Sequence, residues 1–233
     1  MFLSRVHINT QALTPRNLMP LLEGDSYRNH QLLWQLFTAE ETRPFLFRQE
    51  LEQSFDSSSG KPRGLPLFYV LSSIEPQADT DLFTCEVKPF DPKLVSGQQL
   101  GFKLRANPVV AKREEGRKNS RHHDVLMDAK RAAKSNGVTD KVAIQRQMDE
   151  AAQEWLANDS RAEKAGYQLE SVPEISGYQQ HVHRRKGRNI RFSSVDFQGL
   201  LTVTDPDRFM RTLAEGIGRS RAFGCGMWMV RRV

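Results

Sequence analysis

Two residues that can transfer protons lie three positions apart early in the chain. In the segment 25–34 (DSYRNHQLLW), Tyr27 and His30 fall on one surface of a helix that the pattern predicts over residues 27–37, and Trp34 extends this surface. The imidazole of His30 titrates near neutral pH and can give or take a proton at a phosphodiester, while the phenol of Tyr27 can orient an oxygen. The pair is a candidate proton-transfer site, and simple packing of the three rings is the alternative.

A run near the C-terminus, residues 215–226 (EGIGRSRAFGCG), combines four glycines with two arginines and has no acid after Glu215. Such a backbone can approach a phosphate closely, and the arginines supply positive charge. The run follows a predicted helix and precedes a strand, so it is not a dinucleotide-binding fingerprint, and it lacks the lysine of a P-loop. A helix stop with a bulged strand would explain only one or two of the glycines. The candidate contacts are Gly216, Gly218, Arg219, Ser220, Arg221, Gly224 and Gly226.

A basic segment, residues 181–192 (HVHRRKGRNIRF), holds five Lys and Arg and no acid around a predicted Lys-Gly turn. A hairpin of this composition can follow the phosphates of an RNA groove, because A-form RNA is recognised mainly through its shape and backbone. A solvated basic loop is the alternative. The candidate RNA contacts are Arg184, Arg185, Lys186, Arg188 and Arg191, together with Lys103 and Arg105 on a strand predicted at 102–105.

The sequence predicts no metal site and no cofactor. His122, His123 and Asp124 are adjacent, so their side chains point in different directions, and no third ligand is evident. Cys85 and Cys225 lie far apart and match neither zinc nor redox spacing. No segment has the length of a membrane helix or the pattern of a secretion signal. We therefore expect a reduced, cytoplasmic protein with no membrane association.

Charge is unevenly distributed along the 233 residues, whose net charge is +6. Residues 1–102 carry 9 Lys and Arg against 12 Asp and Glu, whereas residues 103–233 carry 25 against 16. An excess of one sign in one part of a chain is self-repulsive unless a polyanion neutralises it. Nucleic acid is the commonest polyanionic partner. A merely solvated basic surface is the alternative.

The element order suggests an α+β protein of two tandem ferredoxin-like (RRM-like) βαββαβ domains, residues 1–96 and 97–233. The first has strands predicted at 2–8, 45–51, 67–71 and 82–87, helical character at 17–22 and 27–37, a loop at 56–60 and only a poor second helix. The second has helices predicted at 142–156 and 206–215, and strands at 102–105, 167–172, 178–182, 189–195, 198–203 and 227–230. Residues 109–141 are highly charged without clear periodicity, which favours a mobile loop.

Five segments, in this order, resemble the CasE family, the CRISPR-associated endoribonuclease of the type I-E Cascade complex. They are residues 1–6 (MFLSRV), 27–34 (YRNHQLLW), 45–48 (FLFR), 102–108 (FKLRANP) and the glycine-containing run 216–226. The resemblance covers almost the whole chain. It implies two ferredoxin-like domains that hold the stem-loop of a CRISPR repeat RNA.

The resemblance also implies roles for single residues. His30 matches the catalytic histidine of the family and Tyr27 its assisting tyrosine, the run 216–226 matches the glycine-rich loop, and Arg184–Arg191 matches the basic hairpin that grips the stem. The cleaved RNA then stays bound, and the protein becomes a Cascade subunit. No site residue is carried over onto the segment 109–141.

These observations lead to the hypothesis of a metal-independent endoribonuclease in which the ribose 2′-hydroxyl attacks the adjacent phosphate. The RNA supplies its own nucleophile, so the protein need only position groups, move protons and stabilise charge. A non-catalytic RNA-binding subunit of a ribonucleoprotein complex is the main alternative. A basic DNA-binding regulator is a third, although the sequence has no helix-turn-helix pattern.

Overall fold

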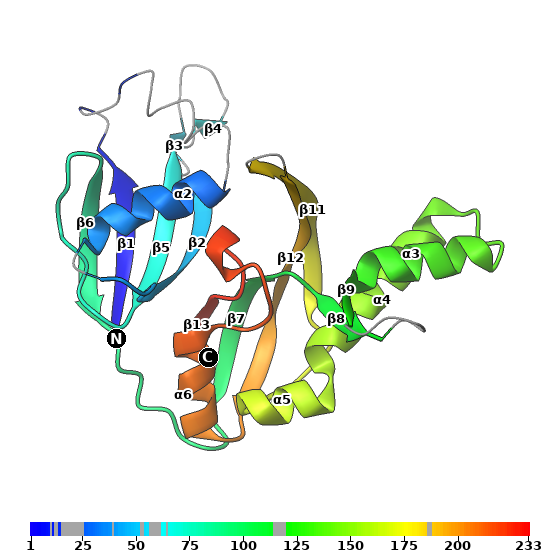
Figure 1. Cartoon of the computed structure of the whole chain (residues 1–233). Helices are drawn as coiled ribbons and strands as arrows, with labels where there is room; N and C mark the ends of the chain where they lie inside the picture. Colours follow the sequence, from blue (N-terminus) through cyan, green and yellow to red (C-terminus); the bar gives the residue numbers. More distant parts are fainter. Residues whose placement is uncertain are drawn as a thin grey trace. The chain divides into compact units, whose positions relative to one another are not determined.

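The computed structural model of the protein describes residues 1–9, 11, 14, 26–38, 40–51, 54–55, 62–63, 65–113, 120–185 and 188–233. The chain forms two compact units (Figure 1): unit 1 comprises Met1–Lys93 and Arg221–Met227, and unit 2 comprises Leu94–Ser220 and Trp228–Val233. Unit 1 thus combines the N-terminal part of the chain with a short segment near the C-terminus. The domain boundary predicted between residues 96 and 97 stays a prediction. The predicted helical segment 17–22 and the loop 56–60 lie outside the described residues.

Unit 1 is built on a four-stranded antiparallel sheet with the strand order β2-β5-β1-β6. Its strands are β1 (Phe2–Ile8), β2 (Phe45–Leu51), β5 (Pro66–Ser72) and β6 (Phe83–Pro89). Helix α2 (Ser26–Leu33) and the 3-10 helix η2 (Trp34–Leu36) lie across one face (Figure 1), and β3 (Ser54–Phe55) pairs with β4 (Pro62–Arg63) outside the sheet. This strand order is that of a ferredoxin-like fold, as predicted.

Alternation along the strands turns one set of side chains of unit 1 toward α2. Val6, Phe47, Phe68 and Phe83 from the sheet pack with Leu33 from the helix, and all five side chains are at most 1% exposed. Residues 73–82, between β5 and β6, form no helix. Pro76 removes a backbone donor there. The Thr80 hydroxyl accepts a hydrogen bond from the Phe83 amide at 3.1 Å in a turn, so the predicted poor helix is absent.

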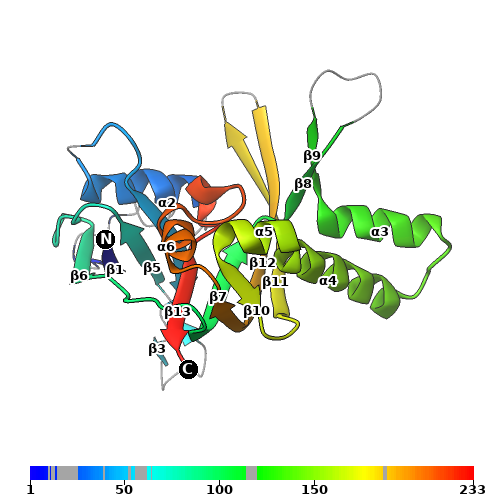
Figure 2. The same cartoon turned by 90° about the horizontal axis from the view of Figure 1, so that it is seen from below.

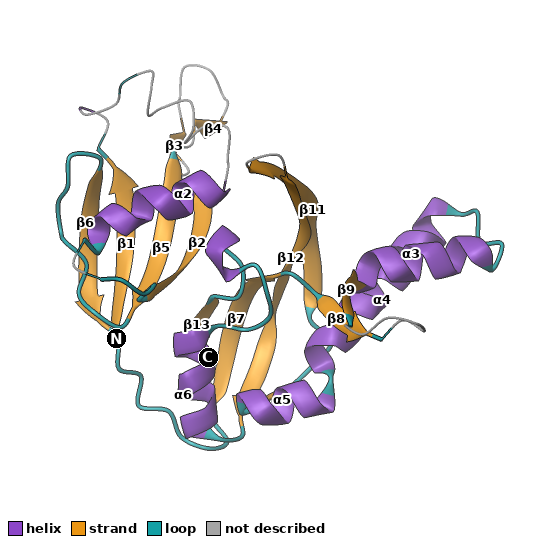
Figure 3. Cartoon of the chain, viewed as in Figure 1, coloured by secondary structure: helices purple, strands orange, loops and turns teal. Residues whose placement is uncertain are grey.

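Unit 2 holds an antiparallel sheet of order β10-β12-β7-β13, with β11 paired to β12. Its strands are β7 (Gln99–Ala106), β10 (Tyr167–Leu169), β11 (Glu174–Arg185), β12 (Arg188–Val203) and β13 (Trp228–Arg232). Helices α4 (Lys141–Ala157), α5 (Asp159–Ala165) and α6 (Pro206–Glu215) accompany the sheet (Figure 3). Trp155 of α4 stacks on Phe197, and Phe209 of α6 lies against Trp228, so both helices cover the same sheet face.

The helices predicted at 142–156 and 206–215 are confirmed by α4 and α6. The segments predicted as separate strands at 189–195 and 198–203 are one continuous strand, β12, and the irregularity lies on β11, between Ser176 and Gln179. The strand predicted at 167–172 ends at Leu169. Among the helices of the described residues, none is long and apolar enough to cross a membrane.

The segment 109–141 is more regular than the predicted loop. It contains the paired strands β8 (Val109–Lys112) and β9 (Arg121–Asp124) and then helix α3 (Val125–Ser135), which packs beside α4 (Figure 2). The Asp124 carboxylate caps α3 by accepting hydrogen bonds from the amides of Leu126 and Met127. Only Leu126 and Ala133 of α3 are buried. The helix was missed because its short apolar stripe is surrounded by charge.

Candidate functional site

Helix α2 and the first residue of η2 arrange the three predicted ring residues in a row. The ring of Tyr27 lies 6.4 Å from that of His30, and the ring of Trp34 lies 6.2 Å from His30 on the other side. The row arises because residues three and four apart in a helix share a surface. The structure therefore brings together the two residues predicted to move protons.

His30 packs against the first residues of strand β2. Its ring lies 5.5 Å from the ring of Phe45 and 6.2 Å from that of Phe47, with which it stacks at 24°. Burial lowers the pKa of His30 to about 4, and the positive charge of Arg43 contributes to this lowering. The Nε2 atom of His30 is covered and has no hydrogen-bond partner in the described part of the chain. In the free protein this imidazole is neutral at neutral pH and has unused hydrogen-bonding capacity.

The residue before His30 fastens the helix to the sheet. Asn29 is fully buried, and its Nδ2 atom donates a hydrogen bond of 2.8 Å to Oε1 of Gln49 on β2. This hydrogen bond offsets part of the cost of burying the amide, whose Oδ1 atom has no partner among the described residues. Asn29 therefore fixes the height and rotation of α2 at the point where His30 projects.

The second half of the glycine-containing run lies in unit 1, against α2 and β2. The 3-10 helix η3 (Arg221–Phe223) places the ring of Phe223 5.9 Å from the ring of Tyr27. Gly224 follows in the left-handed region (φ +79°) and packs on Phe47. The absence of a side chain at Gly224 is what allows this close approach. The run thus brings Arg221 to the surface that carries the Tyr27–His30 pair.

Arg43 is a residue of this surface that the sequence analysis missed. It lies two residues before Phe45 and is half-buried. Burial lowers the pKa of its guanidinium, and the nearby charge of Arg221 lowers it further. In the sequence, Arg43 is marked only by its place directly before Pro44 and a predicted strand. Nothing near it in the sequence indicates that Arg221 would approach it.

The first half of the run lies in unit 2. Asn107 pairs with Arg219 in a β-bridge, and its Nδ2 atom donates a hydrogen bond of 2.7 Å to the Ser220 hydroxyl. Ser220 itself adopts a left-handed conformation (φ 60°). Gly216 ends α6 by donating its amide to the Thr212 carbonyl, and Gly218 (φ +75°) lies against Trp155. The seven candidate contacts predicted as one loop are therefore divided between the two units.

The predicted basic hairpin is formed by β11 and β12, which extend as a two-stranded ribbon (Figure 3). The exposed Arg191 lies opposite Val182 in the register. The ring of Phe192 stacks on His181 at 4.5 Å and on His183 at 5.6 Å, which stiffens the ribbon below its tip. The backbones of Arg184, Arg185 and Arg188 form the end of the ribbon, whereas Lys186 lies outside the described residues.

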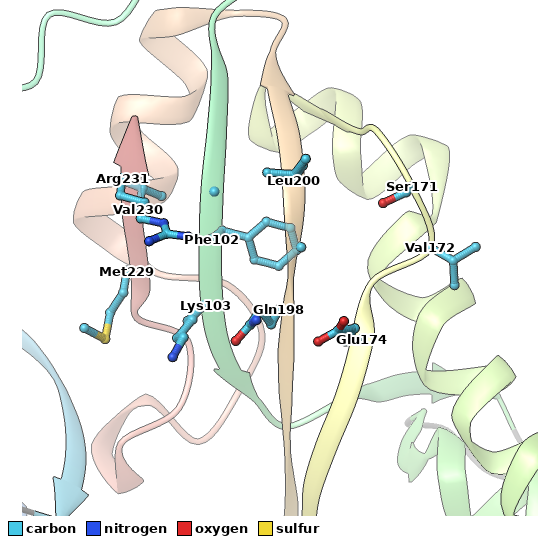
Figure 4. A pocket seen from close by; sticks show the side chains of 12 residues that line it. Phe102, Lys103, Ser171, Val172, Glu174, Gln198, Leu200, Met229, Val230 and Arg231 are labelled. Carbon is cyan, nitrogen blue, oxygen red and sulfur yellow. The ribbon is translucent and has the colours of Figure 1, made fainter. Parts of the chain in front are cut away.

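Lys103 and Arg105, on adjacent outward positions of β7, have different surroundings. Arg105 donates two hydrogen bonds, of 2.9 and 2.8 Å, to the carboxylate of Asp196 on β12. Lys103 lines a cavity of about 660 Å³ on the sheet of unit 2, beside Gln198, Glu174 and Arg231 (Figure 4). Lys103 is therefore available to an external anion, whereas much of the hydrogen-bonding capacity of Arg105 is used within the fold.

The residues His122, His123 and Asp124 have partners within the protein. Asp124 caps α3, His123 lies 3.6 Å from the Asp128 carboxylate, and Nε2 of His122 lies 2.9 Å from Nη1 of Arg219. In the described residues no group of three or more His, Cys, Asp and Glu side chains is arranged to hold a metal ion.

Comparisons with known proteins place the chain among CRISPR-associated proteins. The family model described as "CRISPR associated protein" matches residues 1–232. The chain is 32% identical over 154 residues to the CRISPR-associated endoribonuclease Cse3 of Thermus thermophilus, in a match that covers 61% of this chain and 60% of that protein, less than two thirds of its length. It is 28% identical over 209 residues to the Cascade subunit CasE of Escherichia coli K12, covering 87% of this chain and 90% of that protein. A solved structure of Cse3 bound to a 19-nucleotide RNA superposes with a TM-score of 0.70 and 25% identity, covering 99% of this chain and all of that chain.

Proposed function

Because this chain belongs to the CRISPR-associated protein family, we propose that it is a CasE-type endoribonuclease that cleaves the stem-loop of CRISPR repeat RNA to give guide RNA. Its relatives are named as a CRISPR-associated endoribonuclease and as a Cascade subunit. The structure of the relative Cse3 with bound RNA supports RNA as the substrate. After cleavage the protein keeps its product and joins the other Cascade subunits. We place it in the cytoplasm, in keeping with two cysteines that match no disulfide or zinc pattern.

The reaction that fits these residues is attack by the ribose 2′-hydroxyl on the adjacent phosphate. A bond forms between O2′ and phosphorus as the bond from phosphorus to O5′ breaks, which leaves a 2′,3′-cyclic phosphate and a 5′-hydroxyl. His30 is neutral in the free protein and can accept the proton of the 2′-hydroxyl, a role that contributes about 10²–10⁴-fold. The 5′-oxygen takes up a proton from a water molecule as it leaves, and the Tyr27 hydroxyl, on the same surface of α2 as His30, can donate a hydrogen bond to this oxygen.

One observation carries this proposal: a neutral, half-buried His30 whose Nε2 atom has no partner in the described residues lies beside Tyr27. The ring of Phe223, in the glycine-containing run, lies 5.9 Å from the ring of Tyr27. Buried polar atoms in folded proteins usually have a hydrogen-bond partner, so an open ring nitrogen beside a second proton-transfer group is a candidate for contact with a ligand. A role for His30 in ring packing alone does not give this nitrogen a hydrogen-bond partner. RNA can supply the partner that the free protein lacks.

The cationic surfaces of each unit support binding of an RNA stem. The ribbon of β11 and β12 carries Arg191, and Arg219, Arg221 and Lys103 add positive charge at separate positions. Phosphate contacts by Arg and Lys supply affinity that depends steeply on salt. We propose the same RNA-contacting role for Arg184, Arg185, Lys186, Arg188 and the glycines of the run, and a weaker one for Arg105 because it is paired with Asp196.

The test is cleavage of the repeat RNA of the host by the full chain. Wild-type protein should cut the hairpin in the presence of EDTA and leave a cyclic phosphate. A single 2′-deoxy substitution at the cleaved nucleotide should abolish the reaction, because it removes the nucleophile. Loss of cleavage in EDTA, or unchanged cleavage of the 2′-deoxy RNA, would contradict the mechanism.

Substitution of His30 separates an enzyme from a non-catalytic RNA-binding subunit. His30→Ala and His30→Gln should bind the hairpin with unchanged affinity and cut it at least about 10²-fold more slowly. If the wild type binds the hairpin tightly but never cuts it, the protein is a binding subunit. If duplex DNA competes as well as hairpin RNA, the protein is a DNA-binding regulator.

A further inference from the structure

Two arginines from distant parts of the sequence lie close enough for their charges to interact, and the charge of one of them, Arg43, also acts on His30. Arg43 lies just before β2, whose residue Phe45 packs on the His30 ring at 5.5 Å. The segment η3 reaches the same place because it packs against both α2 and β2, and the charge of Arg221 acts on Arg43. Both arginines belong to unit 1. Unit 1 therefore contains two guanidinium groups in the same region as the residues proposed to transfer protons.

Arg43 has no acidic partner within the described part of the fold. It makes no hydrogen bond or ion pair with any residue there, although it is half-buried. Arg48, on the neighbouring strand β2, is almost fully buried, and its Nε atom lies 2.5 Å from the Glu50 carboxylate. This buried arginine of the same unit therefore has an acidic partner. Among the described residues, Arg43 is thus a half-buried cation close to a second cation, an arrangement that an added anion would stabilise.

We propose that Arg43, together with Arg221, binds the non-bridging oxygens of the scissile phosphate and stabilises the charge that gathers there during cleavage. This inference rests on the proposed function and adds a catalytic residue to it. Guanidinium groups fit phosphate oxygens in a two-pronged arrangement. Negative charge on these oxygens increases as the 2′-oxygen attacks, so the contact is stronger in the transition state than in the bound substrate.

Phosphate binding at Arg43 also changes the proton affinity of His30. In the free protein, burial and the charge of Arg43 keep the pKa of His30 at about 4. A bound phosphate offsets the charge of Arg43, and the pKa of His30 then rises toward its ordinary value. Tyr27, on the same helix, and Arg221, whose charge acts on Arg43, are further titratable groups of this surface. Substrate binding thereby makes the imidazole of His30 a stronger base, so that it retains the proton that it accepts from the 2′-hydroxyl.

The experiment compares the wild type with Arg43→Gln, Arg43→Lys and the control Arg5→Gln. Arg5 is an exposed residue of β1, on the sheet face opposite α2, and its substitution removes the same charge from unit 1. Single-turnover cleavage of the repeat hairpin is measured at saturating protein. The pKa of His30 is followed by NMR in the free protein and with an uncleavable 2′-deoxy hairpin, with His30→Gln used to assign the signal.

Arg43→Gln should slow cleavage by about 10²–10³-fold. It should also raise the pKa of His30 in the free protein and reduce the further rise on RNA binding. Arg43→Lys should retain part of the rate, and Arg5→Gln all of it. Cleavage by Arg43→Gln at the wild-type rate, or a His30 pKa unmoved by this substitution, overturns the inference and leaves the proposed function intact. A wild-type protein that never cuts overturns the proposed function instead, and the NMR titration still tests the contact between Arg43 and phosphate.

Discussion

Gly224 packs directly on Phe47: a Cβ atom added at Gly224 would lie 3.2 Å from Cε2 of the ring. The glycine also has φ +79°, which side-chain-bearing residues rarely adopt. Gly224→Ala therefore combines backbone strain with a close contact. We expect it to lower the free energy of unfolding by about 1–3 kcal/mol and to slow cleavage, because η3 must shift away from α2. Urea unfolding and single-turnover cleavage measure the two effects.

Gly97→Ala is the matched control for Gly224→Ala. Gly97 has nearly the same backbone conformation, φ +82°, but a Cβ atom there meets nothing within 4 Å. This variant should show only the effect of backbone strain, a decrease of about 1 kcal/mol in the free energy of unfolding, and should cleave at the wild-type rate. Equal cleavage by the two variants would mean that contact between the glycine-containing run and β2 does not position the site.

The lowered pKa of His30 predicts how stability depends on pH. At pH 7 the imidazole is neutral in both the folded and the unfolded chain. As the pH falls from 6.5 to about 4, the unfolded chain takes up the proton first, so the folded state loses stability in this window. The difference between the two pKa values, 6.5 and about 4, corresponds to a loss of at most about 3 kcal/mol in the free energy of unfolding. Because the ring is only half-buried, we expect a loss of about 1–2 kcal/mol.

His30→Gln provides the comparison for this pH dependence, because it removes the titrating group at the same place. The free energy of unfolding of the wild type should fall more than that of the variant between pH 7 and pH 4.5. All other titrating residues contribute equally to both proteins and cancel in the difference. Parallel pH profiles would show that the imidazole is protonated as easily in the folded protein as in the unfolded chain.

The hydrogen bond between Asn29 and Gln49 predicts a positioning role for a residue that touches no substrate. Asn29→Ala leaves the half-buried Gln49 amide without this donor, and we expect a loss of about 1–3 kcal/mol in stability. Since α2 is then free to shift, cleavage should slow while RNA affinity stays unchanged. A double-mutant cycle with Gln49→Ala, measured for both stability and cleavage, isolates this interaction. If cleavage is unaffected while stability falls, Asn29 serves the fold alone.

The sequence predicted the features of the site that depend on local periodicity. The row of Tyr27, His30 and Trp34 follows from helical spacing alone, and the strand order of unit 1 follows from the order of its elements. Arg43 could not be predicted, because its significance depends on Arg221, which only the tertiary fold brings near. The division of the glycine-containing run between two units is likewise a property of the fold, since no local signal marks the change between Ser220 and Arg221.

The ribbon of unit 2 predicts a contact with RNA that is purely electrostatic. Arg191 is exposed on β12, and its substitution by Gln should weaken binding of the repeat hairpin without changing the cleavage rate at saturating protein. The slope of log affinity against log salt should become shallower by about 0.7–0.9 for each phosphate that the substituted side chain no longer neutralises. Arg146→Gln is the control, because Arg146 is an exposed arginine of α4 that lies 3.7 Å from Glu150. An unchanged salt slope for Arg191→Gln, or an equal decrease for both variants, would show that this strand of the ribbon does not contact the RNA backbone.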